Sequence, residues 1–130
     1  MDRTEARAAA VKLVYEWEMG GDGGEETRSG MLEIKPDESE TDYMEKLFSG
    51  VTENADKLDA LIAQYAVGWK IERINRVDLS ILRVAAYELT ELKLAPGVAV
   101  NEALELARTY STPEAVSFIN GVLGSLVRGS

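Results

Sequence analysis

The sequence of 130 residues contains no cysteine and no histidine. Without cysteine, the chain cannot form disulfides, thiolate nucleophiles or metal sites with cysteine ligands. Without histidine, it also lacks the commonest general base and the commonest metal ligand. The classes that remain are binding proteins and enzymes that would have to work with carboxylates.

Proline is scarce, with three residues in the chain. Long hydrophobic runs are absent, since no apolar stretch approaches the roughly 20 residues that span a bilayer. Residues 1–19 carry charges throughout, unlike a signal peptide. Apolar residues make up 45 % of the sequence, enough for a real core in one domain of this length. We therefore expect a single soluble, cytoplasmic domain.

The net charge of −9 is unevenly distributed along the chain. Residues 16–45 contain 11 acidic residues and only two basic ones, so this segment alone accounts for the net charge. Residues 20–41 also contain five glycines and show no apolar periodicity, which predicts a mobile acidic loop. The rest of the chain is neutral, so the net charge does not exclude binding to nucleic acid.

Apolar residues recur at helical spacing through most of the remaining sequence, and no segment alternates like a strand. Helices are expected at residues 2–19, across 42–67 with a break near Gly50 and Asn54, from 77 to the turn at Pro96, at 98–109, and after a cap at Thr112. The predicted fold is all-α, a single compact domain of six to seven helices.

The helix that begins at residue 77 is apolar around most of its circumference, so other helices should surround it. Asp78 is the expected N-cap. Arg83, Tyr87 and Glu91 fall on the remaining polar strip, where an aromatic residue is more often a contact residue than filler. Glu88 lies among apolar positions and must find a donor, for which the free N–H groups of the next helix are candidates. For Glu88 a structural role is favoured over a catalytic one.

Residues near the two ends of the chain suggest a binding surface. Arg3, Arg7 and Lys12 are either solvated cations on a surface helix or a phosphate-contacting patch beside Tyr15. Near the other end, Phe118 points away from the apolar face of its helix. Gly121 costs roughly 1 kcal/mol within a helix, which suggests that another backbone or a ligand approaches there.

Five blocks of the sequence resemble the NusB family of bacterial transcription antitermination factors. They read ARAAAVKLVYEWEM, DYMEKLFSGVTENADKLDALI, ILRVAAYEL, PGVAVNEALELA and FINGVL, in this order, and leave out little besides the acidic segment. Five matched blocks in the family's order are a far stronger signal than any single motif in this chain.

The resemblance implies an all-helical fold of two subdomains and a role in transcription antitermination. It implies binding to boxA-type single-stranded RNA of ribosomal operons, together with a small-subunit ribosomal protein, NusE, in the transcription elongation complex. The implied RNA-binding residues are Arg3, Arg7, Lys12, Tyr15, Phe118, Asn120 and Gly121. The implied partner-binding residues are Asp78, Arg83, Tyr87 and Glu91. No cofactor and no metal are expected.

The sequence also departs from the family's pattern. Thr4, Glu5 and Ser117 stand where basic residues are frequent. On single-stranded RNA, each phosphate contact contributes about −0.7 to the slope of the logarithm of affinity against the logarithm of salt concentration. The small number of basic residues therefore predicts a shallow slope and weak binding to RNA alone. The alternative is a helical protein-interaction adaptor that has lost most RNA binding. It would bind its partner through Tyr87 even after Arg3→Ala and Arg7→Ala.

An enzyme is the remaining class. RNA cytosine methyltransferases carry a similar helical domain, but we expect no such catalytic domain in this chain. Glu102 and Glu105 share a helix face and could hold a cation, although such pairs are far more often solvated. No nucleophile–base pair or nucleotide loop is present, so no catalytic activity is expected.

Overall fold

A computed structural model describes residues 2–20 and 38–129. Within these segments the chain forms six α-helices and one short 3₁₀ helix, with no strand. They are α1 (Arg3–Glu18), α3 (Glu38–Glu53), α4 (Ala55–Tyr65), η1 (Ile71–Arg73), α5 (Arg76–Thr90), α6 (Pro96–Tyr110) and α7 (Pro113–Gly129). The all-α prediction is confirmed. None of the described helices is long and apolar enough to cross a membrane.

The acidic segment predicted as a mobile loop lies mostly outside the described residues. Its predicted end at residue 41 was wrong, because residues 38–41 already belong to α3. The predicted break within 42–67 is confirmed at Asn54, which separates α3 from α4. Its side-chain amide donates to the carbonyl of Gly50 at 2.8 Å and so bonds the last turn of α3. Gly50 itself lies inside that helix.

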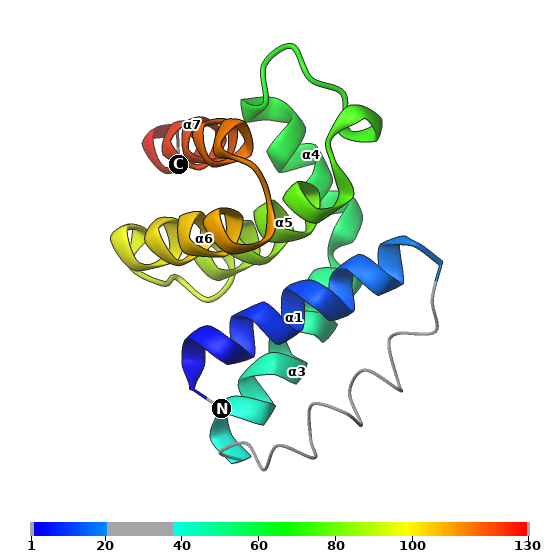
Figure 1. The fold of residues 1–130 in the computed structure, drawn as a ribbon, viewed down its shortest axis with the longest axis vertical. Helices are drawn as coiled ribbons and strands as arrows, with labels where there is room; N and C mark the ends of the chain where they lie inside the picture. The colour runs from blue at the N-terminus through cyan, green and yellow to red at the C-terminus, as the bar shows by residue number, and fades with distance from the viewer. Residues whose placement is uncertain (1, 21–37, 130) are drawn as a thin grey trace.

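The helices form two groups with α5 between them (Figure 1). One group consists of α1 and α3, which lie side by side, and the other contains α4, α6 and α7. Helix α5 packs against each of the other five α-helices. The prediction that other helices surround this segment is therefore confirmed.

Side-chain caps set several helix starts. Asp2 accepts from the backbone N–H of Glu5 at 2.8 Å and begins α1. Asn75 accepts from the N–H of Val77 at 2.8 Å and begins α5, so the prediction of Asp78 as N-cap was wrong. An Asn side chain caps as well as an Asp, and here it stands three residues earlier.

Helix α7 begins where the sequence predicted, whereas α6 does not. The hydroxyl of Thr112 accepts from the N–H of Ala115 at 3.1 Å, as predicted for the cap of the last helix. Helix α6 begins at Pro96, two residues before the predicted start. Proline fits this first position, because the N–H that it lacks would have no partner in the helix.

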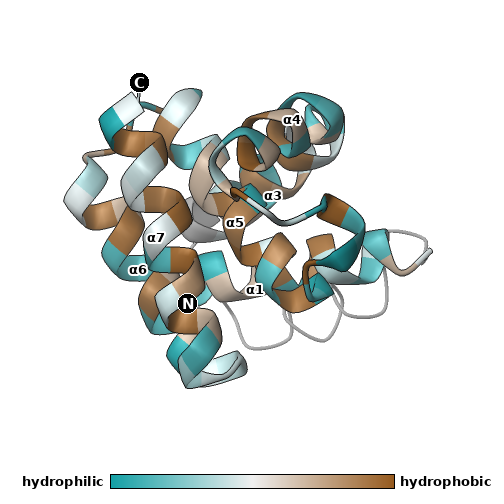
Figure 2. Ribbon diagram, turned by 90° about the horizontal axis from the view of Figure 1, so that it is seen from above, coloured by the Kyte–Doolittle hydropathy of each residue, from teal (hydrophilic) through white to brown (hydrophobic). Residues whose placement is uncertain are grey.

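The hydrophobic core is a single cluster to which all six α-helices contribute. Seen from above, hydrophobic and hydrophilic segments alternate along the helices, as expected of amphipathic helices (Figure 2). The largest fully buried apolar side chains are Leu13, Met44, Leu47, Leu58, Ile62, Leu79, Ile81, Leu82, Ile119, Leu123 and Leu126. Glu88 is buried among them and 1 % exposed, so its carboxylate needs partners inside the protein.

Candidate nucleic-acid interface

The cations predicted to form one patch on α1 lie on two sides of that helix. Arg3 and Lys12 are both exposed, but nine helical residues turn the chain by about 180°. Arg3 stacks on Tyr43 of α3, with its Cζ 3.8 Å from the ring centroid. Lys12 and the half-buried Tyr15 lie on the other side. The single phosphate-contacting patch predicted from the sequence is therefore not formed.

Arg7 is buried and belongs to the protein interior. Its side chain is 4 % exposed, and its Nε donates to Oε2 of Glu88 at 2.8 Å. Its Nη1 lies 3.8 Å from Oε1 of Glu102. The assignment of Arg7 to an exposed RNA-binding patch is therefore corrected. A buried carboxylate must be paired, and Arg7 is the cation that pairs with Glu88.

Glu88 has a second donor in the phenol of Tyr43, whose hydroxyl donates to Oε2. Burial, together with this hydrogen bond to a carboxylate, raises the pKa of Tyr43 to about 12. The expectation that Glu88 needs a donor is thus confirmed. The donors are side chains of α1 and α3, however, and not the N–H groups at the start of α6.

The open side of α1 borders a groove of about 320 Å³ between α1 and α6. The groove is lined by Thr4, Glu5, Ala8, Glu102, Glu105, Leu106, Thr109 and Tyr110. Lys12 follows Ala8 by one helical turn and so continues the same side of α1. Because three carboxylates line this groove, it repels phosphate and is a poor path for RNA.

The two carboxylates considered as a cation site have partners in the protein. Glu102 accepts from the hydroxyl of Thr4 at 3.2 Å, and Glu105 pairs with Arg108 at 2.5 Å. Among the described residues, no group of three or more acidic side chains is arranged to hold a metal ion.

The RNA-binding residues predicted on α7 also diverge. Phe118 and Asn120 are two positions apart, which turns a helix by about 200°. Phe118 is half-buried against Trp69, with ring centroids 5.3 Å apart, while Asn120 is exposed. Gly121 is exposed, and a Cβ placed on it would meet no atom of the described chain within 4 Å. Of the two predicted explanations for this glycine, close approach of another backbone does not hold among the described residues, and approach of a ligand stays a prediction.

A second groove brings aromatic and basic side chains together. It has a volume of about 260 Å³ and lies between the segment around η1 and the start of α7. Its lining is Trp69, Arg73, Ile74, Asn75, Asp78, Thr112, Glu114, Ala115 and Phe118. We call it the aromatic–basic groove. Trp69 is 51 % exposed there.

Lys70 and Arg73 are exposed at or beside the aromatic–basic groove, and neither forms an ion pair with a residue in the described segments. Two carboxylates also line the groove, those of Asp78 and Glu114, and Asp78 is hydrogen-bonded to Ser111. Aromatic faces beside cations that form no ion pair are nevertheless features that bind single-stranded nucleic acid. The sequence analysis did not include Trp69, Lys70 or Arg73 among the candidate residues. The available signal was a tryptophan close to two basic residues in a segment without helical periodicity.

The strip of α5 predicted to bind a partner is largely covered. Arg83 is 3 % exposed and makes two contacts of 2.7 Å with Asp59 and one of 3.1 Å with Glu18. Burial opposes the charge of Arg83, but these carboxylates outweigh it and raise its pKa above the ordinary value. Asp78 is buried as well and accepts from the hydroxyl of Ser111 at 2.6 Å. Both assignments are therefore corrected: these groups bind helices together.

Tyr87 is half-buried against α3. Of the four residues assigned to the partner, only Glu91 is exposed, and it pairs with Lys57 of α4 at 2.7 Å. This ion pair and the electrostatic attraction of Lys57 lower the pKa of Glu91. The predicted docking strip is thus reduced to its last residue, at the end of α5.

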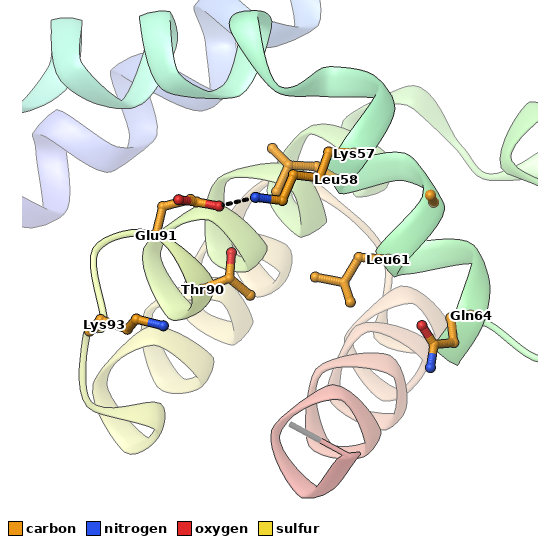
Figure 3. Close-up of a pocket in the computed structure, with 8 residues that line it drawn as sticks. Lys57, Leu58, Leu61, Gln64, Thr90, Glu91 and Lys93 are labelled. Atoms are coloured by element: carbon orange, nitrogen blue, oxygen red, sulfur yellow. Dashed lines mark hydrogen bonds and ion pairs between the residues drawn. The ribbon is translucent and has the colours of Figure 1, made fainter.

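Glu91 and Lys57 lie at one end of a larger groove of about 620 Å³ between α4 and the end of α5 (Figure 3). Its lining is Lys57, Leu58, Ala60, Leu61, Gln64, Thr90, Glu91 and Lys93. Leu61 and Thr90 point into the space between the two helices. We call it the α4–α5 groove. Its apolar floor and charged edge are what a protein-binding surface requires.

Known proteins resemble nearly the whole chain. Residues 4–128 match the model of the NusB family. The transcription antitermination protein NusB of Acetivibrio thermocellus is 42 % identical over 130 residues, covering 98 % of this chain and 90 % of that protein. The structure of T. maritima NusB superimposes with a TM-score of 0.86 at 29 % identity, covering 98 % of this chain and 92 % of that one.

A second similar structure is a crystal structure of the antitermination factors NusB and NusE in complex with dsRNA. It superimposes with a TM-score of 0.88 at 26 % identity and covers 98 % of this chain and 97 % of that one. The fold of this chain is therefore that of the NusB structures over nearly its whole length.

Proposed function

This chain belongs to the NusB family, and we propose that it acts as a transcription antitermination factor that binds boxA-type single-stranded RNA of ribosomal operons together with NusE. The observation that carries the proposal is the full-length similarity to a NusB whose crystal structure includes NusE and dsRNA. We further propose that the protein is cytoplasmic and acts by binding, without catalysis.

For RNA, we propose the aromatic–basic groove as the main contact. Stacking of a base on an aromatic side chain contributes about 1–3 kcal/mol, and Trp69 and Phe118 provide such faces. Lys70 and Arg73 supply cations for neighbouring phosphates. Gly121, exposed on α7 about one helical turn after Phe118, extends this surface, and Asn120 is proposed as a separate RNA contact on the opposite side of the helix.

A second RNA contact is proposed on α1 at Arg3. Lys12 and Tyr15, on another side of this helix, are proposed to contact a different part of the RNA, whereas Arg7 is buried and pairs with Glu88. Figure 1 shows the N-terminal end of α1 in one part of the molecule and η1 with α7 in the other. An extended single strand can reach both, because its backbone is flexible and its charges are spaced along its length.

For NusE, we propose the α4–α5 groove as the docking surface. Leu61 offers an apolar contact within it, and Glu91 and Lys57 supply charges of both signs at its edge. Docking there would leave the aromatic–basic groove open, since the two grooves share no lining residue. RNA and NusE could then bind together.

The direct test is a titration of fluorescently labelled boxA-type RNA with the protein, alone and with purified NusE, read by anisotropy at several salt concentrations. We expect weak binding by the protein alone and tighter binding with NusE. The proposal would be overturned if neither RNA nor NusE bound at low salt.

The second candidate function is a helical adaptor that binds only proteins. Its support is the burial of Arg7 and Arg83, which removes two arginines from the surface of an already acidic chain. In the same titration, the adaptor predicts NusE binding whose affinity does not change when RNA is added.

A further inference from the structure

The segment between α4 and α5 carries Trp69, Lys70 and Arg73 to the aromatic–basic groove on one short turn. The backbone N–H of Arg73 donates to the carbonyl of Lys70 at 2.9 Å, and that of Ile74 donates to the carbonyl of Ile71 at 3.2 Å. These two bonds close η1, and a 3₁₀ turn of this length has poor hydrogen-bond geometry of its own. The orientation of the groove residues therefore depends on what holds this turn from outside.

The side chain of Arg76, the first residue of α5, binds the turn through its backbone carbonyls. Its Nε and Nη2 donate to the carbonyl of Ile74 at 3.1 and 2.7 Å, and Nη2 also donates to the carbonyl of Ile71. A guanidinium presents its donors in a rigid planar fork, so these bonds fix the turn relative to α5. Lysine could not replace this arginine, because its ammonium is a single point charge on a flexible stem.

Glu18, the last residue of α1, holds Arg76 in turn. Its Oε1 accepts from Nη1 of Arg76 at 2.7 Å, and its Oε2 accepts from Nη1 of Arg83 at 3.1 Å. Arg83 is buried and is bound to Asp59 of α4 by two contacts of 2.7 Å. Side chains of α1, α4 and α5 thus form one continuous network that ends on the backbone of η1.

Arg76 itself is a poor ligand for a phosphate. Its side chain is 25 % exposed, and Glu18 neutralises its charge. Four of the five N–H donors of its guanidinium are used within the protein. Lys70 and Arg73, in contrast, are exposed. A turn that is already ordered spares RNA binding part of the entropy cost of ordering these side chains.

We propose that Arg76 is a positioning residue for RNA: it holds η1 so that Trp69, Lys70 and Arg73 meet the nucleic acid together. The inference rests on the proposed RNA binding in the aromatic–basic groove. It adds a residue of α5 that acts without contacting RNA. Through Glu18, it also makes the end of α1 a support for the groove.

The first test measures the turn in the free protein, by amide hydrogen exchange followed by NMR. Arg76→Met removes the bonds to both carbonyls, so exchange at the amides of Arg73 and Ile74 should be roughly tenfold faster. The matched control is Gly50→Ala, which crowds Tyr87 between α3 and α5. It lowers global stability without touching η1, so these two amides should exchange as in the wild type.

The second test measures affinity for boxA-type RNA at several salt concentrations. Arg76→Met should bind roughly fivefold to tenfold more weakly, because RNA must then order the groove itself. Arg76→Lys keeps the charge but not the fork, so it should lose most of the same affinity. The salt slope of Arg76→Met should stay close to that of the wild type, whereas loss of a direct phosphate contact would change it by about 0.7.

The inference is overturned if Arg76→Met leaves exchange at Arg73 and Ile74 unchanged, or if it speeds exchange but binds RNA as tightly as the wild type. It is also overturned if Arg76→Lys binds RNA as the wild type does, or if the salt slope reports the loss of a phosphate contact. Circular dichroism checks folding, and if Arg76→Met does not fold, Arg76→Lys serves for both measurements. A wild-type protein that binds no RNA would instead overturn the proposed function and this inference with it, whatever the exchange result.

Discussion

The ring of Tyr87 on α5 fills the space beside Gly50 of α3. A Cβ placed on Gly50 would lie 2.1 Å from Cε1 of Tyr87, far inside van der Waals contact. Glycine therefore allows α3 and α5 to approach at this point, even though it weakens the helix in which it stands.

We expect Gly50→Ala to destabilise the protein by about 1–2 kcal/mol. The added methyl displaces the Tyr87 ring, and such overpacking typically costs about 1–3 kcal/mol, partly offset by the better helix propensity of alanine. The matched control is Gly121→Ala, at an exposed helical position with open space around it, which should stabilise by up to about 1 kcal/mol. Urea unfolding of both variants measures the difference, and equal effects would contradict the packing role of Gly50.

The buried pair of Arg7 and Glu88 gives a second prediction. Arg7→Ala should cost about 3–5 kcal/mol of unfolding free energy, because it leaves Glu88 charged, buried and unpaired. The double variant Arg7→Met/Glu88→Leu should recover much of this loss. Arg108→Ala, which breaks an exposed pair with Glu105, should change stability by no more than about 0.5 kcal/mol. A similar small effect for Arg7→Ala would show that its ion pair is not needed.

The pH dependence of stability should report on Glu18. Burial acts to raise its pKa, but hydrogen bonds and attraction from Arg76 and Arg83 lower it below the ordinary value. A lowered folded-state pKa means that the contribution is present above the unfolded-state value and is lost as the pH falls through the folded-state value. Glu18→Gln should therefore destabilise at pH 7, and its difference from the wild type should shrink below about pH 4.

This dependence is measured by urea unfolding of both proteins between pH 7 and pH 3. Glu105→Gln is the control, since its carboxylate lies in an exposed pair. A difference between Glu18→Gln and the wild type that stays constant across this range would contradict the account of Glu18.

Helix periodicity predicted the helices and the central position of α5, because the spacing of apolar residues along the sequence shows which side of a helix is buried. It did not predict what covers the polar face of α5. Arg83 was expected at the surface, yet carboxylates from α1 and α4 reach it. Asp59 of α4 is 24 residues from Arg83 in the sequence, and Glu18 of α1 is 65 residues from it. No local sequence pattern indicates such a contact.

The same limit applies to the candidate site. The need of Glu88 for a donor could be predicted, because a buried charge must be paired. The identity of Arg7 as that donor could not, since it stands 81 residues away. The divergence of Arg3 and Lys12 around α1, by contrast, follows from helical geometry alone and was available from the sequence.

Docking of NusE in the α4–α5 groove predicts that one substitution in this groove weakens binding of the protein partner alone. Ala60 is exposed and lines this groove, so Ala60→Arg should place a long charged side chain in it without disturbing the fold. We expect NusE binding to weaken at least tenfold while binding to RNA alone is unchanged. Ala63→Arg, at an exposed position of α4 outside the lining, is the matched control. Equal NusE affinity for both variants, measured by calorimetry, would place the partner elsewhere.

The central claim, that RNA binds in the aromatic–basic groove, can be tested by the fluorescence of a single tryptophan. The chain has two, Trp17 and Trp69, so Trp17→Phe leaves Trp69 as the only one. A base that stacks on Trp69 quenches its fluorescence, so titration with boxA-type RNA should quench this variant in step with the anisotropy of the labelled RNA. The converse variant, Trp69→Phe, should bind more weakly and show little quenching of the half-buried Trp17. RNA binding that leaves the fluorescence of Trp69 unchanged would contradict the account.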